Sequence, residues 1–326
     1  MKTKPDISII IPVYNAGKWL SRCLDSIKKQ TFGNFEVIMV NDASTDNSVE
    51  IATEYVRRDD RFLLINKNKN EGTMSARESG YQKAEGNYIT FSDADDYLPE
   101  NAFQILYDKI TTDHSDIVFG GYTIAGKNHS LKKIREVPSG SSENDIQILL
   151  LRQKLPNTLW GNIYSSNLFK NYPLKAFKGL TNAEDRMLLI QLVSNAKKFS
   201  HTDDSTYYYY QNDQSNSRTK ISERVLKNII FSNDWCYRFL MNKGIRPRII
   251  QAYQLYRTRY LLELGARISD IMAFTTLNNS IYSFTTARKQ VNLPFAIHYS
   301  LLRNSRLYVY GYSALKNIYY RLSNRK

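Results

Sequence analysis

Cysteine and long apolar segments are both scarce in this chain. Only two cysteines occur among 326 residues, Cys23 and Cys236, far apart and without a metal-type partner. They fit packed thiols in a reduced, cytoplasmic compartment. No run reaches the roughly 18 apolar residues that a spanning helix needs. The first residues lack the apolar segment and cleavage site of a signal peptide, so we expect a cytoplasmic protein.

Acidic residues are nearly absent from the last third of the chain. Residues 218–326 hold 19 Lys and Arg against 4 Asp and Glu, whereas residues 1–217 hold 26 against 27. The whole excess behind the formal net charge of +14 therefore belongs to the tail. Such an asymmetry indicates an anionic partner for the tail.

Short apolar runs alternate with helical patterns over the first hundred residues. The runs are rich in β-branched residues, which is typical of strands buried on both faces, and they occupy residues 7–13, 35–40, 62–65 and 88–91. Helical spacing lies between them. This alternation predicts an α/β fold with a mostly parallel, doubly wound sheet and helices on both faces.

The later part of the chain is less regular. We expect a helix after Pro99, a strand at 116–122, a polar loop or small hairpin at 126–142, a helix at 146–155 and a strand at 207–210. From Ser222 onward the pattern is helical, with frequent tyrosine and arginine. These elements predict a second lobe followed by a helical C-terminal region.

Three aspartates follow the fourth predicted strand, at Asp93, Asp95 and Asp96. Two unit charges about 5 Å apart repel by roughly 3 kcal/mol at an effective dielectric of about 20, so something should offset this repulsion. One reading is a helix cap at Asp96. The other is a cation, because Asp93 and Asp95 project to the same side of an extended chain. Mg²⁺ or Mn²⁺ held by one or two carboxylates keeps positions open for phosphate oxygens.

The sheet order predicts where these carboxylates lie. Pro12, Asp42 and the aspartates at 93–96 each stand at or just past the carboxyl end of a predicted parallel strand. Ligands of doubly wound sheets bind at that edge. The topology therefore predicts that the three segments converge on one site.

Four segments over residues 8–96 carry a resemblance to a known family: "SIIIPVYNAGKWLSRCLDSIKKQTF", "FEVIMVNDASTDNS", "NEGTMSARESG" and "GNYITFSDADD". Together and in this order they resemble the nucleotide-binding half of the family-2 glycosyltransferases, inverting enzymes with a single Rossmann-like GT-A domain. Later segments, "LWGNIY", "NAEDRMLL" and "YYYYQNDQSNS", resemble acceptor-side segments of bacterial surface-polysaccharide members. The resemblance covers about residues 6–217.

The basic helical region at 218–326 lies outside the resemblance and is expected from its charge and its helical pattern. The resemblance implies a nucleotide-sugar-binding domain at 1–125 and an acceptor-binding lobe of the same GT-A domain at 126–217. It implies a hexosyl- or N-acetylhexosaminyltransferase that moves one sugar from a UDP-sugar to a saccharide acceptor, which we expect to be lipid-linked. Capsule, lipopolysaccharide or exopolysaccharide synthesis would be the pathway. No Gln-x-x-Arg-Trp segment occurs, so the chain does not resemble a processive synthase.

The resemblance assigns the nucleobase to Pro12, Val13 and Tyr14, with the Tyr14 ring against uracil. Asp42 would accept the uracil imide N–H, and Asn41 stands where many relatives carry another aspartate. A strand-end core aromatic is the alternative for Tyr14. A turn residue with a local cap is the alternative for Asp42.

The remaining donor-side roles follow from the third and fourth segments. Asn70, Gly72 and Arg77 would form a loop and helix start, in which Gly72 permits a positive φ. Arg77 would place a positive charge near the uridine or diphosphate, with a surface arginine as the alternative. Asp93 and Ala94 would meet the ribose or donor sugar.

The metal and the catalytic base complete the implied site. Asp95 would bind Mn²⁺ or Mg²⁺, and the base must lie on the opposite face of the donor sugar, on another segment. By resemblance Asp185 is that base, and Glu184 orients the donor or acceptor sugar. A helix-capping motif is the alternative for this pair. Trp160 is expected to stack on a sugar ring, with a core tryptophan as the alternative.

The basic tail leaves three partners open. Tyrosine with lysine and arginine suits an anionic membrane surface, so we favour peripheral attachment at the cytoplasmic face of the inner membrane. Helix packing or a homo-oligomer contact is the second reading. Nucleic acid is the third, but no nucleic-acid motif is visible, so we expect none to bind.

Two rival functions are a sugar-nucleotide pyrophosphorylase and a non-catalytic nucleotide-sugar-binding protein. The first would want a glycine-rich basic loop directly after the first strand, and "PVYNAGKW" lacks one. The intact aspartates Asp93, Asp95 and Asp185 argue against the second.

Overall fold

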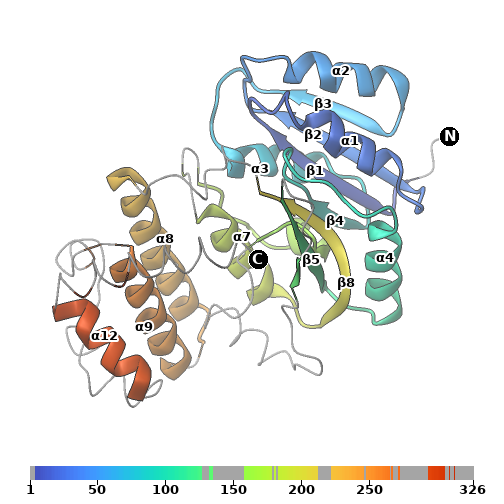
Figure 1. Cartoon of the computed structure of the whole chain (residues 1–326). Helices are drawn as coiled ribbons and strands as arrows, with labels where there is room; N and C mark the ends of the chain where they lie inside the picture. The colour runs from blue at the N-terminus through green and yellow to red at the C-terminus, as the bar shows by residue number, and fades with distance from the viewer. Residues whose placement is uncertain are drawn as a thin grey trace. The chain divides into compact units, whose positions relative to one another are not determined.

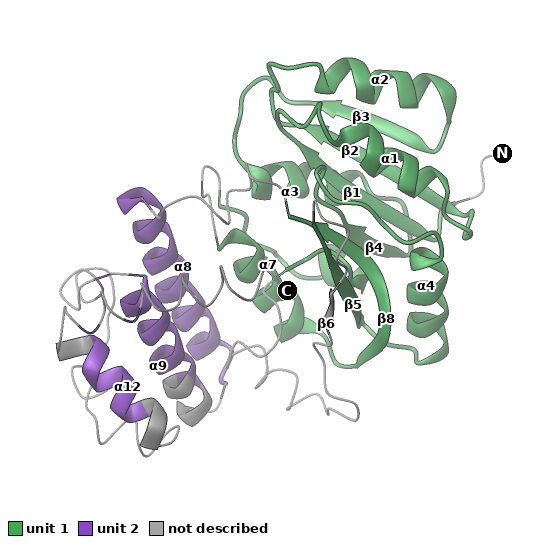
Figure 2. Cartoon of the chain, viewed as in Figure 1, with its two compact units in different colours: residues 1–147, 154–219 green, residues 148–153, 220–326 purple. Residues whose placement is uncertain are grey.

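A computed structural model shows the chain as two compact units (Figure 2). Unit 1 consists of Met1–Gln147 with Lys154–Thr219, and unit 2 of Ile148–Gln153 with Lys220–Lys326. The structure describes residues 4–126, 132–134, 158–177, 180, 183–211, 222–245, 247–264, 266, 271, 293–304, 308 and 312. The expected helix at 146–155 and most of the expected loop at 126–142 lie outside these residues.

Four parallel strands form the first half of the sheet in unit 1 (Figure 1). β1 (Ile7–Val13) lies between β2 (Phe35–Asn41) and β4 (Tyr88–Phe91), and β3 (Phe62–Asn66) pairs with β2. Every isoleucine of β1 is fully buried. The β-branched runs therefore form strands covered on both faces, as predicted.

Helices cover the two faces of this half of the sheet. Three of them connect the strands: α1 (Leu20–Lys28), α2 (Ser48–Arg58) and α3 (Thr73–Lys83). Ile9 belongs to the core that the buried face of α1 completes, with the free thiol of Cys23 in it. Ile10 points to the other face, where a Cβ added to Gly80 of α3 would lie 2.4 Å from the Ile10 Cγ2. Successive strand residues thus meet helices on opposite faces.

The sheet continues beyond β4 in strands of mixed direction. β7 (Ile163–Ser165) pairs antiparallel with β4 and with β5 (Ile117–Ala125). β5 also pairs antiparallel with β6 (Lys132–Ile134) and parallel with β8 (Phe199–Tyr210). The described strands form one eight-stranded sheet in the order β3-β2-β1-β4-β7-β5-β6, with β8 beside β5. The predicted fold class is confirmed.

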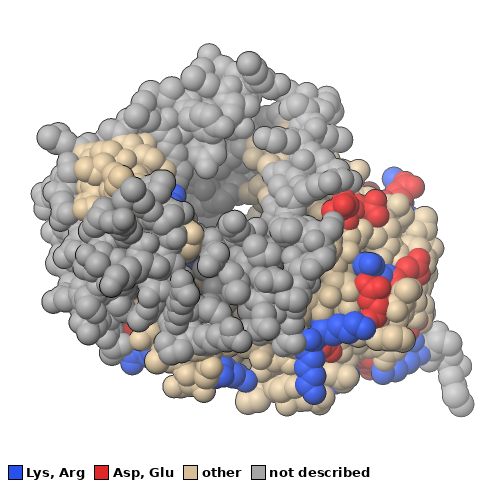
Figure 3. All heavy atoms as spheres, turned by 90° about the horizontal axis from the view of Figure 1, so that it is seen from below, with Lys and Arg blue, Asp and Glu red and all other residues tan. Residues whose placement is uncertain are grey.

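Three further helices complete the described part of unit 1: α4 (Ala102–Thr112), α6 (Asn167–Lys170) and α7 (Glu184–Asn195). α4 packs on β8, and α6 contacts both β7 and α7. Acidic and basic side chains lie side by side on the face drawn in Figure 3. This mixture agrees with the near balance of charge before residue 218.

Unit 2 is helical in its described part, with α8 (Glu223–Asn242), α9 (Pro247–Glu263) and α12 (Leu293–Asn304). α8 begins where the Ser222 hydroxyl accepts the Val225 N–H at 3.3 Å. α9 packs against both other helices. Over the described ranges, no helix combines the length and apolar character needed to cross a membrane.

Candidate active site

The carboxyl ends of β1, β2 and β4 meet at one edge of the sheet. Val13 at the end of β1 pairs with Asn41 of β2, and β4 ends beside the middle of β1. Pro12, Asp42 and the aspartates after β4 therefore converge, as the topology predicts. Tyr14 follows β1 directly and is 52% exposed, so the core alternative for this ring is wrong.

The aspartates after β4 form a turn. The Asp96 N–H donates to the Asp93 carbonyl oxygen at 3.2 Å. The expectation that Asp93 and Asp95 project to one side of an extended chain is therefore wrong. Aspartate is a favoured turn residue because its side chain bonds the local backbone readily. In this turn Ala94 is buried, and Asp93 and Asp95 are half-buried.

Asp96 anchors the turn to β8. Its Oδ2 accepts the Tyr207 hydroxyl at 2.8 Å, and its Oδ1 accepts the Tyr210 N–H at 2.7 Å. Burial, with the charges of Asp95 and Asp93 nearby, raises the pKa of this carboxyl well above its usual value. The helix-cap reading of Asp96 is wrong, because α4 begins only at Ala102 and has no side-chain cap.

The Tyr207 hydroxyl binds the turn at Asp93 as well as at Asp96. The hydroxyl accepts the Asp93 N–H at 3.0 Å, and the residue is fully buried. Its ring stacks on Trp160, with 4.4 Å between the ring centroids. Trp160 is only 8% exposed and belongs to the hydrophobic core. The structure thus corrects the role expected for Trp160 to the core alternative, since the indole is already stacked on tyrosine.

Arg77 joins the turn after β4 to the start of α7. Its Nη2 donates to Asp93 Oδ1 at 2.9 Å, and its Nη1 donates to Asp185 Oδ1. The arginine side chain is 2% exposed, so the surface alternative is wrong. One guanidinium therefore brings a donor-side carboxylate and the expected base into a single site.

Glu184 and Asp185 form the first turn of α7. The preceding residue, Ala183, has a φ of 68°, and Asn182, on which the capping alternative rests, lies outside the described residues. Burial raises the pKa of Asp185 to about 7, helped by the charges of Glu184 and Asp93 and opposed by Arg77. Burial likewise raises the pKa of Glu184, whose Oε2 is buried and has no hydrogen-bond partner among the described residues. The pKa of about 7 suits Asp185 to act as a general base at neutral pH.

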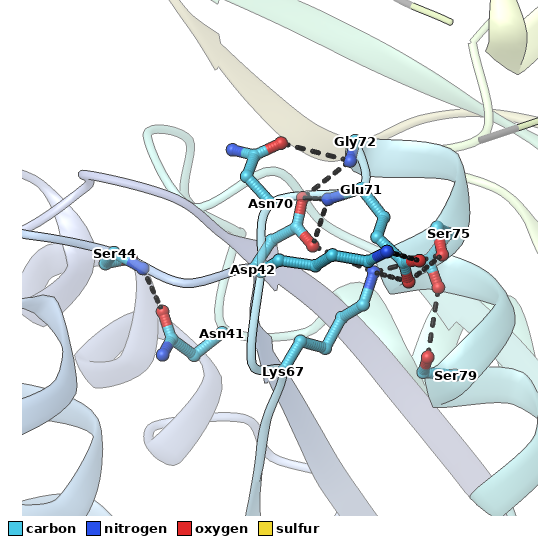
Figure 4. Close-up of polar contacts among 10 residues, drawn as sticks. Asn41, Asp42, Ser44, Lys67, Asn70, Glu71, Gly72, Ser75 and Ser79 are labelled. Atoms are coloured by element: carbon cyan, nitrogen blue, oxygen red, sulfur yellow. Dashed lines mark hydrogen bonds and ion pairs between the residues drawn. The ribbon is translucent and has the colours of Figure 1, made fainter. Parts of the chain in front are cut away.

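Asp42 lies in a nearly enclosed cluster of charges (Figure 4). Lys67 Nζ is 2.8 Å from its Oδ1 and 3.1 Å from Glu71 Oε2. The Asp42 oxygens also accept the N–H groups of Glu71 and Gly72, the latter at 2.7 Å. The side chain is only 4% exposed. Asp42 thus fixes the loop that leads into α3, and its contact with uracil stays a prediction.

The loop before α3 has the positive φ that was expected at Gly72. Gly72 has a φ of 92°, which a residue with a side chain rarely adopts. The Asn70 side-chain oxygen accepts the Gly72 N–H at 3.2 Å. Asn41 turns its side chain to Asn66 and to the Ser44 N–H. The loop and the strand end are therefore held together by side-chain amides and Asp42.

A model of the family described as glycosyl transferase family 2 matches residues 8–177, just over half of the chain. The chain belongs to this family. The family predicted from the four segments is confirmed.

Curated relatives of this glycosyltransferase come from several bacteria. It is 31% identical to the uncharacterized glycosyltransferase EpsJ of Bacillus subtilis over 65% of this chain and 62% of EpsJ. It is 34% identical to glycosyltransferase GlyA of Streptococcus pneumoniae over 50% of this chain and 25% of GlyA. The chain thus spans less than two thirds of the length of these relatives.

Solved structures share the fold. Staphylococcus aureus TarS 1-349 in complex with UDP-GlcNAc aligns with a TM-score of 0.61 at 19% identity, covering 92% of this chain and 91% of that one. The mannosyltransferase PcManGT from Pyrobaculum calidifontis, in complex with GDP-Man and Mn²⁺, aligns with a TM-score of 0.58 at 16% identity, covering 97% and 88%.

The turn after β4 has suitable chemistry for a divalent cation. Asp95 offers a half-buried carboxylate, and Arg22 donates to its backbone carbonyl oxygen at 2.6 Å. Among the residues that the structure describes, no three His, Cys, Asp or Glu side chains gather to hold an ion alone. Mg²⁺ and Mn²⁺ commonly take one or two carboxylates and complete their shell with phosphate oxygens. Asp95 fits a metal held jointly with a diphosphate.

The sequence did not predict three residues that contribute to the site: Tyr207, Lys67 and Arg22. Tyr207 stands in a run of four tyrosines, and only the pairing of β8 shows which hydroxyl meets the aspartates. Lys67 follows β3 and reads as an ordinary surface lysine. Arg22 lies on α1, where its guanidinium also covers the Tyr210 ring at 3.9 Å from the centroid. Strand alternation could have singled out Tyr207 and Tyr209 as one face of β8.

Proposed function

We propose that this family-2 glycosyltransferase moves one sugar from a UDP-sugar to a saccharide hydroxyl with inversion. The observation that carries the proposal is the contact of one guanidinium with both Asp93 and Asp185. It sets a carboxyl with a pKa raised to about 7 beside the turn that bears Asp95. The fold shared with a TarS structure in complex with UDP-GlcNAc also supports a UDP-sugar donor.

Asp185 acts as the general base. It takes the proton of the acceptor hydroxyl while that oxygen attacks the anomeric carbon, opposite the departing UDP. The base and the donor-side turn belong to different elements, α7 and the end of β4, which suits attack from the opposite face. Glu184, which stands beside Asp185 in the first turn of α7, orients a hydroxyl of the donor or acceptor sugar.

The donor lies at the strand ends. The exposed Tyr14 ring, next to Pro12 and Val13, stacks on the base, and the loop at Asn70 and Gly72 borders it. Asp93 and Ala94 lie along the ribose or donor sugar. A bound Mn²⁺ or Mg²⁺ at Asp95 would neutralise the charge that grows on the diphosphate. Whether the sugar is a hexose or an N-acetylhexosamine follows from a donor screen.

The acceptor is proposed to be a lipid-linked saccharide of a surface polysaccharide, reached at the cytoplasmic face of the inner membrane. The excess of Lys and Arg after residue 217 supports this location. Co-sedimentation with vesicles of anionic and of zwitterionic lipid tests it. Equal binding to both vesicles removes the membrane proposal, and a concentration-dependent mass in ultracentrifugation favours a homo-oligomer contact instead.

A UDP-release assay with a panel of UDP-sugars, acceptor saccharides and Mn²⁺ tests the reaction. We expect Asp185→Asn to lower turnover by about 100-fold or more, the usual size of a general-base effect. Asp95→Asn should remove the Mn²⁺ dependence of UDP binding in calorimetry. Turnover of Asp185→Asn at the wild-type rate would show that Asp185 is not the general base. Donor binding without any UDP release would favour the non-catalytic reading, and pyrophosphate exchange with UTP would favour a pyrophosphorylase.

A further inference from the structure

Arg77 contacts carboxylates where the family resemblance expects it to meet the donor's uridine or diphosphate. Its two terminal nitrogens are engaged, one with Asp93 and one with Asp185. We infer that Arg77 is a positioning residue, which aims the Asp185 carboxylate and keeps it ionised rather than binding the diphosphate. The inference rests on the proposed role of Asp185 as the base.

Burial of Arg77 supports this role. The side chain is 2% exposed, and its Nε is enclosed without a hydrogen-bond partner. A phosphate oxygen needs donors that point into the ligand site, and charge-assisted bonds of this kind are short and directional. Asp93 and Asp185 use two of the five guanidinium N–H groups, and because the side chain is 2% exposed the other N–H groups are not open to a diphosphate.

Charge supports it as well. The groups that act on Asp185 come from four elements: Arg77 of α3, Asp93 after β4, Glu184 of its own helix, and the buried phenol of Tyr164 on β7. Arg77 is the positive group among these four. Burial and the two carboxylates favour the protonated form of Asp185, and Arg77 alone of the four opposes them. Without Arg77 the base would hold its proton to a higher pH.

The first test is the pH profile of kcat/KM for UDP release. In Arg77→Met we expect the acidic limb of the kcat/KM profile to shift to a pH higher by one unit or more. Activity should recover at high pH. A shift from about 7 to about 8 lowers the ionised fraction at pH 7 about five-fold. Arg77→Lys should restore part of the shift. Arg57→Met, at an arginine whose side chain is 71% exposed, is the control and should leave the profile unchanged.

The second test needs no turnover. Arg77→Met should lower the melting temperature, and adding Asp185→Asn should recover part of the loss, because the second change removes an uncompensated buried carboxylate. Calorimetry with UDP and Mn²⁺ should show no weakening in Arg77→Met. A UDP affinity at least tenfold weaker, with the pH limb unmoved, would overturn the inference, as would a melting temperature that Asp185→Asn does not recover.

The two tests separate this inference from the proposed function. If no donor yields UDP, the proposed reaction fails, yet the coupling between Arg77 and Asp185 is still measured by unfolding. If UDP is released but the pH limb and the coupling do not respond to Arg77, the reaction stands and the positioning role is wrong. If Arg77→Met does not fold, the same measurements of pH profile and melting temperature are made on two other variants. These are Arg77→Lys and the double variant Arg77→Met/Asp185→Asn.

Discussion

Tyr207→Phe removes one oxygen atom from beneath the turn that carries Asp95. The phenyl ring would keep its stacking on Trp160, where the centroids lie 4.4 Å apart. The lost hydroxyl donates to Asp96 Oδ2 at 2.8 Å and accepts the Asp93 N–H at 3.0 Å. The substitution therefore removes the two hydrogen bonds that fix both ends of the turn, together with a longer contact of the hydroxyl with Ser92 Oγ at 3.4 Å.

The expected loss follows from burial. A bond to a carboxyl group contributes about 1.5–3 kcal/mol, and a buried donor left without an acceptor costs about 1–3 kcal/mol. Because both bonds share one hydroxyl, their effects are not simply additive. We expect a free energy of unfolding lower by about 3 kcal/mol. For a unit of about 200 residues this corresponds to a fall in melting temperature of about 6–12 °C.

Urea unfolding at pH 7 measures the change, with Tyr208→Phe as the matched control. Tyr208 is the next residue of β8, is half-buried, and its ring lies tilted against the Tyr97 ring. We expect the control to lose less than about 0.5 kcal/mol. If the two variants lose equal free energy, the Tyr207 hydroxyl does not hold the turn and the reasoning is refuted.

Two further substitutions test buried polar groups elsewhere. Lys67→Met should cost about 3 kcal/mol in urea unfolding, because Asp42, with 4% of its side chain exposed, loses its cation; a loss below about 1 kcal/mol would contradict this. Gln254→Leu in α9 should leave stability unchanged or raise it by about 1 kcal/mol, since this amide is 4% exposed and both its polar atoms lack a partner. A clear loss in its thermal unfolding would show that water or a ligand satisfies the amide.

The sequence was sufficient for the four parallel strands of the first hundred residues and for their converging ends. Uninterrupted β-branched runs can be buried on both faces only in a covered sheet, so β1 and β4 form with the predicted bounds. The order of the elements then brings Asp42 and Asp93 to one edge. Local sequence patterns predict the strands and their order because each strand and helix buries its own apolar residues.

The contacts across the site could not be predicted in the same way. Whether Asp93 stands in a strand or a turn depends on the hydrogen bond from Asp96, which no residue pattern encodes. From the sequence, Trp160 was expected to stack on a sugar ring, with a core tryptophan as the alternative, and its stacking on Tyr207 shows that it belongs to the core. Such contacts join segments far apart in the chain, so they follow from the tertiary fold rather than from local periodicity.

The strength of the base shows the same dependence on packing. Asp185 begins a helix, and the helix dipole stabilises a carboxylate there by about 0.3–1 kcal/mol, which is less than one pKa unit. Alone, this effect would lower the pKa. Burial, together with the neighbouring Glu184, instead raises the pKa to about 7. An identical Glu-Asp pair on an exposed helix would be a weaker base, so the enclosure of α7, rather than the motif, sets the pH at which the site can accept a proton.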